Sequence, residues 1–416
     1  MKKLIVFCTL LSSIILLAAP QVRASRQSAV YKVGENIVFN ITDAPAGALY
    51  RVGDSAETGK FQKLEGNTVT FKAEKPGFVL FELKLPKQKP PVIYGGAAIE
   101  PEKIRPGTAC PADFDAFWAN ELKLLRARPL EVIKKIPVPA DKLPAGVIGF
   151  DVHVKRGDVV VSGYLAMPAG KKAKSLPARI NFNGASKVSA DLKNAGSNAR
   201  NSIAITFNIN FHGLENSFNK VDDIITGNRK KVAAYQYLKA NDKQAYAMRK
   251  IFLRTVVAAD YVMSLPEYNG NLGTYGGSLG GCQSIVCAAL VPEVKYCVAT
   301  ASAMCDHQGA KAGHIPGWPK LLTDSRTPKG AEAISSYFDM VNFASRIKCP
   351  VLMAVGFIDT TCSPASTYAA YNSLTTKVRQ MNHVVTGGHG PVWDPKERSV
   401  FVQGGAVFHK WIRGAR

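Results

Sequence analysis

The sequence has few of the features that mark membrane, zinc-binding or nucleic-acid-binding proteins. After the first 24 residues no apolar run is long enough to cross a bilayer, so a stable membrane anchor is not expected. No C-x-x-C pair and no standard ligand spacing occur, and we predict neither a metal site nor any other cofactor. Internal repeats, low-complexity tracts and nucleic-acid-binding motifs are also missing, which argues against a nucleic-acid partner.

Acidic residues are scarce relative to basic ones. The 416 residues include 31 Asp and Glu against 53 Lys and Arg, and the formal net charge is +22. The basic residues are spread in small groups, such as those at 171–174 and 228–231. This pattern predicts a well-solvated surface, with attraction to an acidic polysaccharide or a cell surface as the alternative.

The N-terminus has the pattern of an export signal. Lys2 and Lys3 precede an apolar run, and Val22-Arg23-Ala24 suits cleavage after Ala24. A membrane anchor is the alternative, but the run is short for a bilayer span. We therefore predict a signal peptide over residues 1–24 and a soluble periplasmic or extracellular protein.

Seven cysteines follow the predicted signal peptide. An odd number cannot pair completely within one chain, and most of them lie in apolar runs such as S-I-V-C-A-A-L. Buried free thiols are therefore expected, although the pattern leaves any disulfide pairing open.

The distribution of strand and helix patterns predicts two domains. Short strands with alternating polarity indicate a small β-sandwich-like domain over residues 25–90. A proline- and glycine-rich linker is expected over 91–110. Buried strands then alternate with helices over 111–416, which predicts an α/β domain around a mostly parallel sheet.

One serine lies between two pairs of glycines. Gly276-Gly277-Ser278-Leu279-Gly280-Gly281 follows a predicted buried strand and precedes a predicted helix. This is the G-x-S-x-G context of a nucleophile, in which Gly276 and Gly280 must be small because strand and helix pass closely. Packing or phosphate binding are the alternatives for such a turn.

A serine nucleophile needs a base and an orienting carboxylate downstream. Asp359 follows the buried strand C-P-V-L-M-A-V-G, and His389 follows the next strand in T-G-G-H-G. The amides of Leu279 and Ala185 are the predicted oxyanion donors. His212 precedes the serine, and His307 and His314 have no standard metal-ligand spacing, so these are weaker candidates.

From residue 111 to the C-terminus the chain resembles the acetyl xylan esterase and cephalosporin C deacetylase family. The supporting stretches are D-F-D-A-F-W, S-L-P-E-Y, G-G-S-L-G-G, A-A-L-V-P-E-V and the long run from Tyr337 to Pro364. The resemblance implies an α/β-hydrolase fold, Ser278, Asp359 and His389 as the catalytic triad, and removal of acetyl groups from sugars. Leu279 and Ala185 depart from the family's usual Gln and aromatic residue.

The leading interpretation is a secreted carbohydrate O-acetyl esterase that acts on an acetylated oligosaccharide or polysaccharide. An esterase of another acyl substrate, or a serine peptidase of the same fold, is the second interpretation. A binding protein on an inactive hydrolase scaffold is the third. The sequence leaves open the sugar, the acetylated position, the role of the N-terminal domain and a homo-oligomer.

Overall fold

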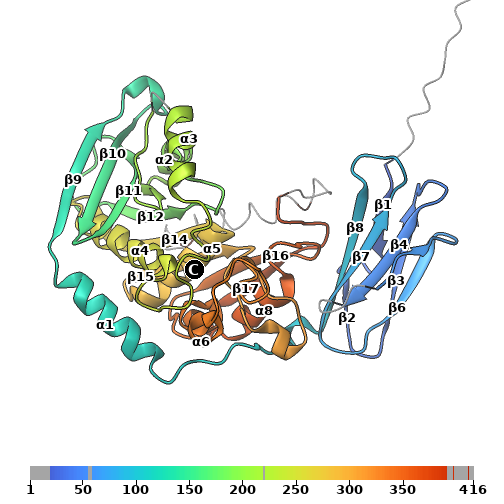
Figure 1. Cartoon of the computed structure of the whole chain (residues 1–416). Helices are drawn as coiled ribbons and strands as arrows, with labels where there is room; N and C mark the ends of the chain where they lie inside the picture. The colour runs from blue at the N-terminus through green and yellow to red at the C-terminus, as the bar shows by residue number, and fades with distance from the viewer. Residues whose placement is uncertain (1–18, 55–58, 219–220, 391–396, 398–410, 412–416) are drawn as a thin grey trace, which may run out of the picture.

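The computed structural model describes residues 19–54, 59–218, 221–390, 397 and 411 (Figure 1). Most of the predicted signal peptide and His409 lie outside these residues. No helix within the described ranges has the length and apolar character needed to cross a membrane.

A nine-stranded sheet forms the centre of the larger domain, in the order β17-β16-β15-β14-β12-β13-β11-β10-β9. Strands β12 to β17 are parallel, whereas β9, β10 and β11 pair antiparallel at one edge. The predicted mostly parallel α/β sheet is therefore confirmed. The strands are β9 (Leu130–Pro137), β10 (Val147–Arg156), β11 (Val159–Pro168), β12 (Leu176–Phe182), β13 (Ile205–Asn210), β14 (Tyr268–Gly277), β15 (Val294–Thr300), β16 (Val351–Gly356) and β17 (Arg379–Val384).

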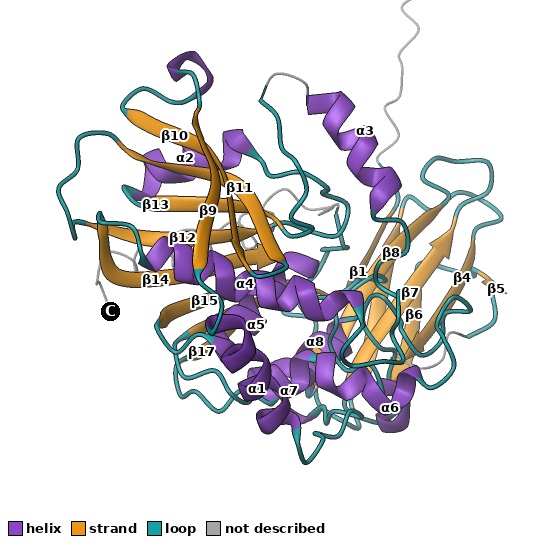
Figure 2. Ribbon diagram, turned by 60° about the vertical axis from the view of Figure 1, so that its left-hand side comes forward, coloured by secondary structure: helices purple, strands orange, loops and turns teal. Residues whose placement is uncertain are grey.

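Helices cover both faces of this sheet (Figure 2). Helices α4 and α5 pack against each other on one face, and α2 packs against β11 and β13 on the other. Both faces of the central strands are consequently buried, as expected of parallel strands. The helices are α1 (Phe114–Arg126), α2 (Leu192–Ser202), α3 (Val221–Lys231), α4 (Ala247–Met263), α5 (Leu279–Leu290), α6 (Ala331–Ser335), α7 (Met340–Ala344) and α8 (Pro364–Asn372).

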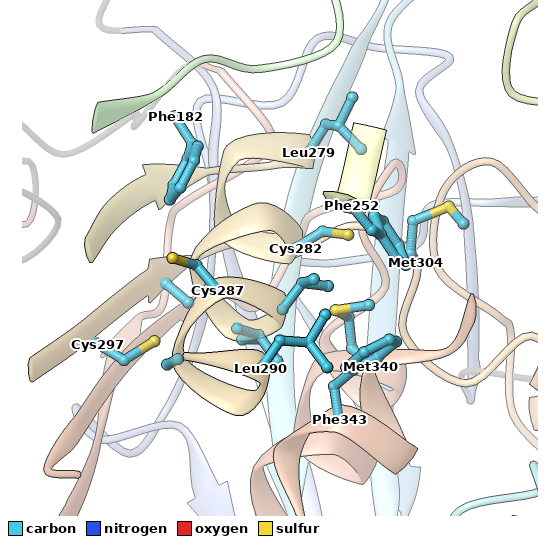
Figure 3. Close-up of a cluster of buried hydrophobic side chains, with 14 of the residues drawn as sticks. Phe182, Phe252, Leu279, Cys282, Cys287, Leu290, Cys297, Met304, Met340 and Phe343 are labelled. Atoms are coloured by element: carbon cyan, nitrogen blue, oxygen red, sulfur yellow. The ribbon is translucent and has the colours of Figure 1, made fainter. Parts of the chain in front are cut away.

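Helix α5 runs through the largest hydrophobic core (Figure 3). Its residues are almost all buried, and Phe252 from α4 and Phe343 from α7 are part of the same core. Cys282 and Cys287 of α5 are free thiols buried in this core. Four more free cysteines, on other segments of the described chain, are buried in the same core, and Cys110 is exposed. The serine that precedes α5 is therefore attached to one of the most rigidly packed elements of the molecule.

The N-terminal strands form two small sheets packed around their own core (Figure 1). The orders are β1-β3-β6 and β2-β8-β7-β4-β5. The predicted β-rich region is thus present. Its strands are β1 (Gln21–Ala24), β2 (Val30–Tyr31), β3 (Asn36–Thr42), β4 (Leu49–Asp54), β5 (Gln62–Lys63), β6 (Thr68–Lys72), β7 (Gly77–Lys84) and β8 (Val92–Ile99).

The observed boundaries of the N-terminal domain differ from the predicted ones. Residues 92–99, expected in the linker, form strand β8 beside β7. Gly95 and Gly96 contributed to the linker prediction, but in the strand they permit close approach: a Cβ on Gly95 would lie 2.5 Å from Val22 Cγ1. At the other end, Gln21–Ala24, expected in the signal peptide, pair with β3 as strand β1.

The N-terminal domain packs against the catalytic domain. Phe78 of β7 makes an edge contact with Phe357, with ring centroids 5.2 Å apart. A Cβ on Gly96 would lie 2.8 Å from Phe357 Cβ and 3.0 Å from Ile358 Cγ2. Phe357 and Ile358 directly precede Asp359. The N-terminal domain therefore packs against the loop that carries this carboxylate and supports it.

Candidate active site

Ser278 lies in a sharp turn between β14 and α5. Its backbone angles are φ 58° and ψ −124°, a conformation that a residue with a side chain adopts only under constraint. The Ser278 amide donates to the Thr300 carbonyl at 2.9 Å, and its carbonyl accepts from the Ala303 amide at 3.0 Å. These bonds to the loop after β15 hold the serine in its strained conformation.

The four glycines around Ser278 differ in how much space a side chain would have in their place. A Cβ on Gly276 would lie 2.3 Å from the Gly280 backbone, and one on Gly280 would lie 2.2 Å from the Phe182 carbonyl oxygen. Neither position has room for a side chain. A Cβ on Gly281 would lie 2.6 Å from the Ser302 hydroxyl oxygen, and this hydroxyl can rotate away. The tightest constraints thus fall on the two positions of the G-x-S-x-G pattern.

The structure brings Ser278, His389 and Asp359 into one hydrogen-bonded chain. Nε2 of His389 lies 3.0 Å from Ser278 Oγ, and Nδ1 lies 2.8 Å from Asp359 Oδ2. The three residues come from the ends of β14, β17 and β16, which are parallel strands that end at the same edge of the sheet. The arrangement has the geometry of a nucleophile, a base and an orienting acid.

Asp359 is buried and its two oxygens have separate partners. Oδ1 accepts hydrogen bonds from the amides of Thr361 and Cys362 at 2.8 and 2.9 Å, which leaves Oδ2 for His389. The two amide donors fix the orientation of this carboxylate. The loop after β16 therefore positions the imidazole as well as the acid.

The loop after β12 lies beside the serine. A Cβ on Gly184 would be 3.8 Å from Ser278 Cβ, so the backbone at 184–185 passes close to the nucleophile. Within the described part of the chain, the amides of Ala185 and Leu279 have no hydrogen-bond acceptor. Both predicted oxyanion donors are therefore available to a ligand.

Side-chain amides that the sequence interpretation missed hold this loop in place. Gln283 Nε2 donates to the carbonyls of Asn183 and Leu279 at 3.3 and 3.2 Å. Asn183 Nδ2 in turn donates to Asn208 Oδ1 at 2.9 Å. The one available signal was a glutamine in the apolar run after the serine, where a buried amide requires partners.

The other histidines lie outside the hydrogen-bonded chain. His212 makes a tilted contact with Phe211 and an edge contact with Tyr235, and burial lowers the pKa of its imidazole to about 3. His314 lies 3.0 Å from Asp306, whose carboxylate also accepts from the amide of Thr108. This second network attaches the segment before α1 to the catalytic domain.

Comparison with known proteins identifies the family. A model of the acetyl xylan esterase (AXE1) family matches residues 100–392. The chain belongs to this family. Among curated proteins, acetyl esterase Axe7A of Xylanibacter ruminicola is 29% identical over 372 residues, covering 83% of this chain and 81% of that protein. The resemblance inferred from the sequence is thus confirmed, and the protein is a carboxylic ester hydrolase that acts on acetylated carbohydrate.

Two solved acetyl xylan esterases share the fold. The enzyme of Paenibacillus sp. R4 superposes with a TM-score of 0.59 at 22% identity, covering 73% of this chain and 97% of its own. Acetyl xylan esterase 1 of Thermoanaerobacterium sp. JW/SL YS485 gives 0.58 at 22% identity, covering 77% and 99%. The α/β-hydrolase fold is therefore confirmed.

Proposed function

We propose that the protein removes acetyl groups from polysaccharide sugars through an acyl-enzyme on Ser278. The observation that supports this most strongly is the Ser278–His389–Asp359 hydrogen-bonded chain in a member of the acetyl xylan esterase family. In this proposal Asp359 accepts from Nδ1–H of His389, so that Nε2 is free to take the serine proton.

The reaction proceeds in two halves. Ser278 Oγ attacks the acetyl carbon while His389 Nε2 removes its proton, and the amides of Leu279 and Ala185 stabilise the oxyanion. His389 then protonates the sugar oxygen, which leaves as the free hydroxyl. Water, deprotonated by the same imidazole, attacks the acetyl-serine, and acetate departs as Ser278 regains its proton.

Ser278→Ala tests the proposal. Acetate release from acetylated xylo-oligosaccharides should fall roughly 10⁴- to 10⁶-fold, because the variant lacks the nucleophile. Ser175→Ala is the control, since the exposed Ser175 hydroxyl contacts only the Lys172 carbonyl. Near-full activity of a folded Ser278→Ala variant would remove this serine from its proposed role.

The second candidate function is hydrolysis of longer acyl esters, because Ala185 is smaller than the aromatic residue expected in the family. We expect acetyl esters to be preferred, since each methylene added to an occupied pocket costs about 1–3 kcal/mol. The specificity constants for acetyl, butyryl and octanoyl esters measure this preference. A preference for octanoyl would contradict the acetyl-esterase proposal, whereas equal rates on acetyl and butyryl would indicate a pocket that Ala185→Tyr should narrow.

We also propose that the protein is exported, because the first residues have a signal-peptide pattern. Cleavage after Ala24 would remove β1, whose Val22 is buried in the N-terminal core. The mature protein is therefore expected to begin before Gln21. Mass spectrometry of the exported protein measures this end, and a mature chain that starts at Ser25 would contradict the expectation.

A further inference from the structure

A cavity of about 570 Å³ opens beside the loop that carries the proposed oxyanion donor Ala185. One wall is formed by residues 186–193, which continue directly from Ala185, and another by Ser217 and Phe218 together with Ile225 and Arg229 of α3. These segments follow β12 and β13, two adjacent parallel strands of the sheet. The cavity therefore lies at the same edge of the sheet as Ser278, and its volume is typical of ligand sites.

The cavity is rich in positive charge. Four cationic side chains contribute to its lining, against the single carboxylate of Asp191. That carboxylate already accepts a hydrogen bond from the Asn194 amide at 2.9 Å. No described residue forms a salt bridge with any of the four cations. The cations are Lys142, Lys187, Lys193 and Arg229.

The walls between these charges are apolar. Val188 is buried, and Phe218 is partly buried against the small cluster between α2 and β11. Lys142 Nζ donates to the Phe218 carbonyl at 3.1 Å and lies over the Phe218 ring, 5.9 Å from its centroid, so one cation is held against this aromatic side chain. An aromatic face beside cations and polar groups suits a pyranose ring, whose C–H face is apolar and whose substituents are polar.

A buried hydroxyl in the lining has no partner. Tyr164 is 1% exposed, and its hydroxyl makes no hydrogen bond to any described residue. Burial also raises the pKa of this phenol, so it remains a neutral donor. An unpaired buried hydroxyl is costly, and a ligand hydroxyl or carboxylate in the cavity would satisfy it.

We propose that this cavity is a subsite for a uronic acid of an acetylated polysaccharide. The carboxylate is held by the cations of α2 and α3, while the acetylated sugar lies at Ser278. This inference rests on the proposed carbohydrate esterase function and adds the charge of the substrate to it. It also gives a local role to part of the protein's large positive charge.

The test uses two acetylated xylo-oligosaccharides that differ in one group. One carries a glucuronic acid, and in the other its carboxylate is reduced to a hydroxymethyl group. At low ionic strength the native protein should show a kcat/KM for the acidic form that is roughly three- to tenfold higher. Salt should reduce this ratio, because the cations are exposed.

Variants on α2 and α3 connect the preference to the cavity. Lys193→Glu with Arg229→Gln should lower the ratio to one or less. Arg200→Glu with Lys230→Gln is the matched control: it changes the same charge on the same helices at residues outside the lining, and should leave the ratio unchanged. Tyr164→Phe should weaken binding of both oligosaccharides without lowering the melting temperature, since its hydroxyl has no partner among the described residues.

A native ratio near one, or an equal loss in the cavity variant and its control, would overturn the proposal. If neither oligosaccharide is hydrolysed, the proposed function fails, and calorimetry with the deacetylated acidic oligosaccharide still tests the subsite. Native protein that binds this ligand more tightly than the Lys193→Glu/Arg229→Gln variant would support the subsite independently. Equal binding by the two would refute it.

Discussion

The two sides of Ser278 are supported by different kinds of contact. On the side of Asp359 the support is apolar, because Phe357 and Ile358 pack against Phe78 and Gly96 of the N-terminal domain. The loop that carries Ala185 is instead held by hydrogen bonds that side-chain amides donate, from Gln283 to the Asn183 carbonyl and from Asn183 to the Asn208 side chain. Apolar packing depends on the volume of the side chains in contact, whereas an amide network depends on the orientation of its donors and acceptors. Variants that change only one of these properties should therefore affect the two sides unequally.

The largest effect is expected on the oxyanion side, at Gly280, where α5 touches the end of β12. Gly280→Ala would place a Cβ 2.2 Å from the Phe182 carbonyl and displace the end of β12 from α5. We expect kcat/KM to fall by at least about 100-fold, because displacement of the oxyanion loop by 1 Å is sufficient for such a loss. Gly227→Ala is the control, since its Cβ would meet no atom within 4 Å. A fully active Gly280→Ala variant would contradict the packing described here.

Phe78→Ala should weaken the Asp359 side specifically. Loss of a buried phenylalanine should cost about 3–5 kcal/mol of stability, and movement of the Asp359 loop should lower kcat by roughly tenfold. Phe39→Ala removes an equally buried ring that belongs to the N-terminal core alone. Both variants should lose stability, but only Phe78→Ala should lose kcat per folded molecule, measured well below the melting temperature. Equal kcat in the two variants would show that the N-terminal domain does not position Asp359.

Acid should destabilise the oxyanion side through His212. Burial lowers the pKa of this imidazole to about 3 in the folded protein, from an ordinary value near 6.5. The unfolded chain therefore binds more protons between these values, so stability is lost as pH falls from 6.5 towards 3. The slope is about 1.4 kcal/mol per pH unit at most for one group. Denaturant unfolding between pH 4 and 8 measures it, and His212→Phe should flatten the curve; an unchanged curve would contradict the assignment.

The smallest effect on stability is expected from Gln283→Met. This change removes two hydrogen bonds, but it also removes Oε1, a buried acceptor that has no partner among the described residues. The loss of the two hydrogen bonds and the removal of the unpaired acceptor have opposite effects, so the free energy of unfolding should stay within about 1 kcal/mol of the native value. The oxyanion loop loses its tie to α5, so kcat should fall several-fold with little change in KM. A fall in melting temperature without any change in kcat would indicate that Gln283 is only structural.

The sequence was informative where a local pattern and the backbone conformation coincide. G-x-S-x-G requires a strand, a sharp turn and a helix, and apolar runs such as C-P-V-L-M-A-V-G are long enough to be recognised as buried strands. These patterns predicted β14, α5, β16 and the position of Ser278. Asp359 and His389 followed from chain order along parallel strands.

The sequence was uninformative where distant segments meet. Gly95 and Gly96 were interpreted as part of a linker, because the reason for their small size, contact with Val22 and Phe357, lies elsewhere in the chain. The partner that ties Gln283 to the loop, the Asn183 carbonyl, is likewise 100 residues away. The contacts of the N-terminal domain with the Asp359 loop and the amide network that holds the Ala185 loop could therefore be found only in the structure.

The six buried free thiols affect how the folded protein is irreversibly inactivated. Burial raises the pKa of Cys282 and Cys297, so these groups remain unreactive thiols while the fold is intact. Unfolding exposes all six together, and in air they would pair at random. Under oxidising conditions the random disulfides prevent refolding, so unfolding is irreversible. The lifetime of the enzyme outside a reducing environment should then be set by its rate of unfolding, and not by the equilibrium between folded and unfolded chains.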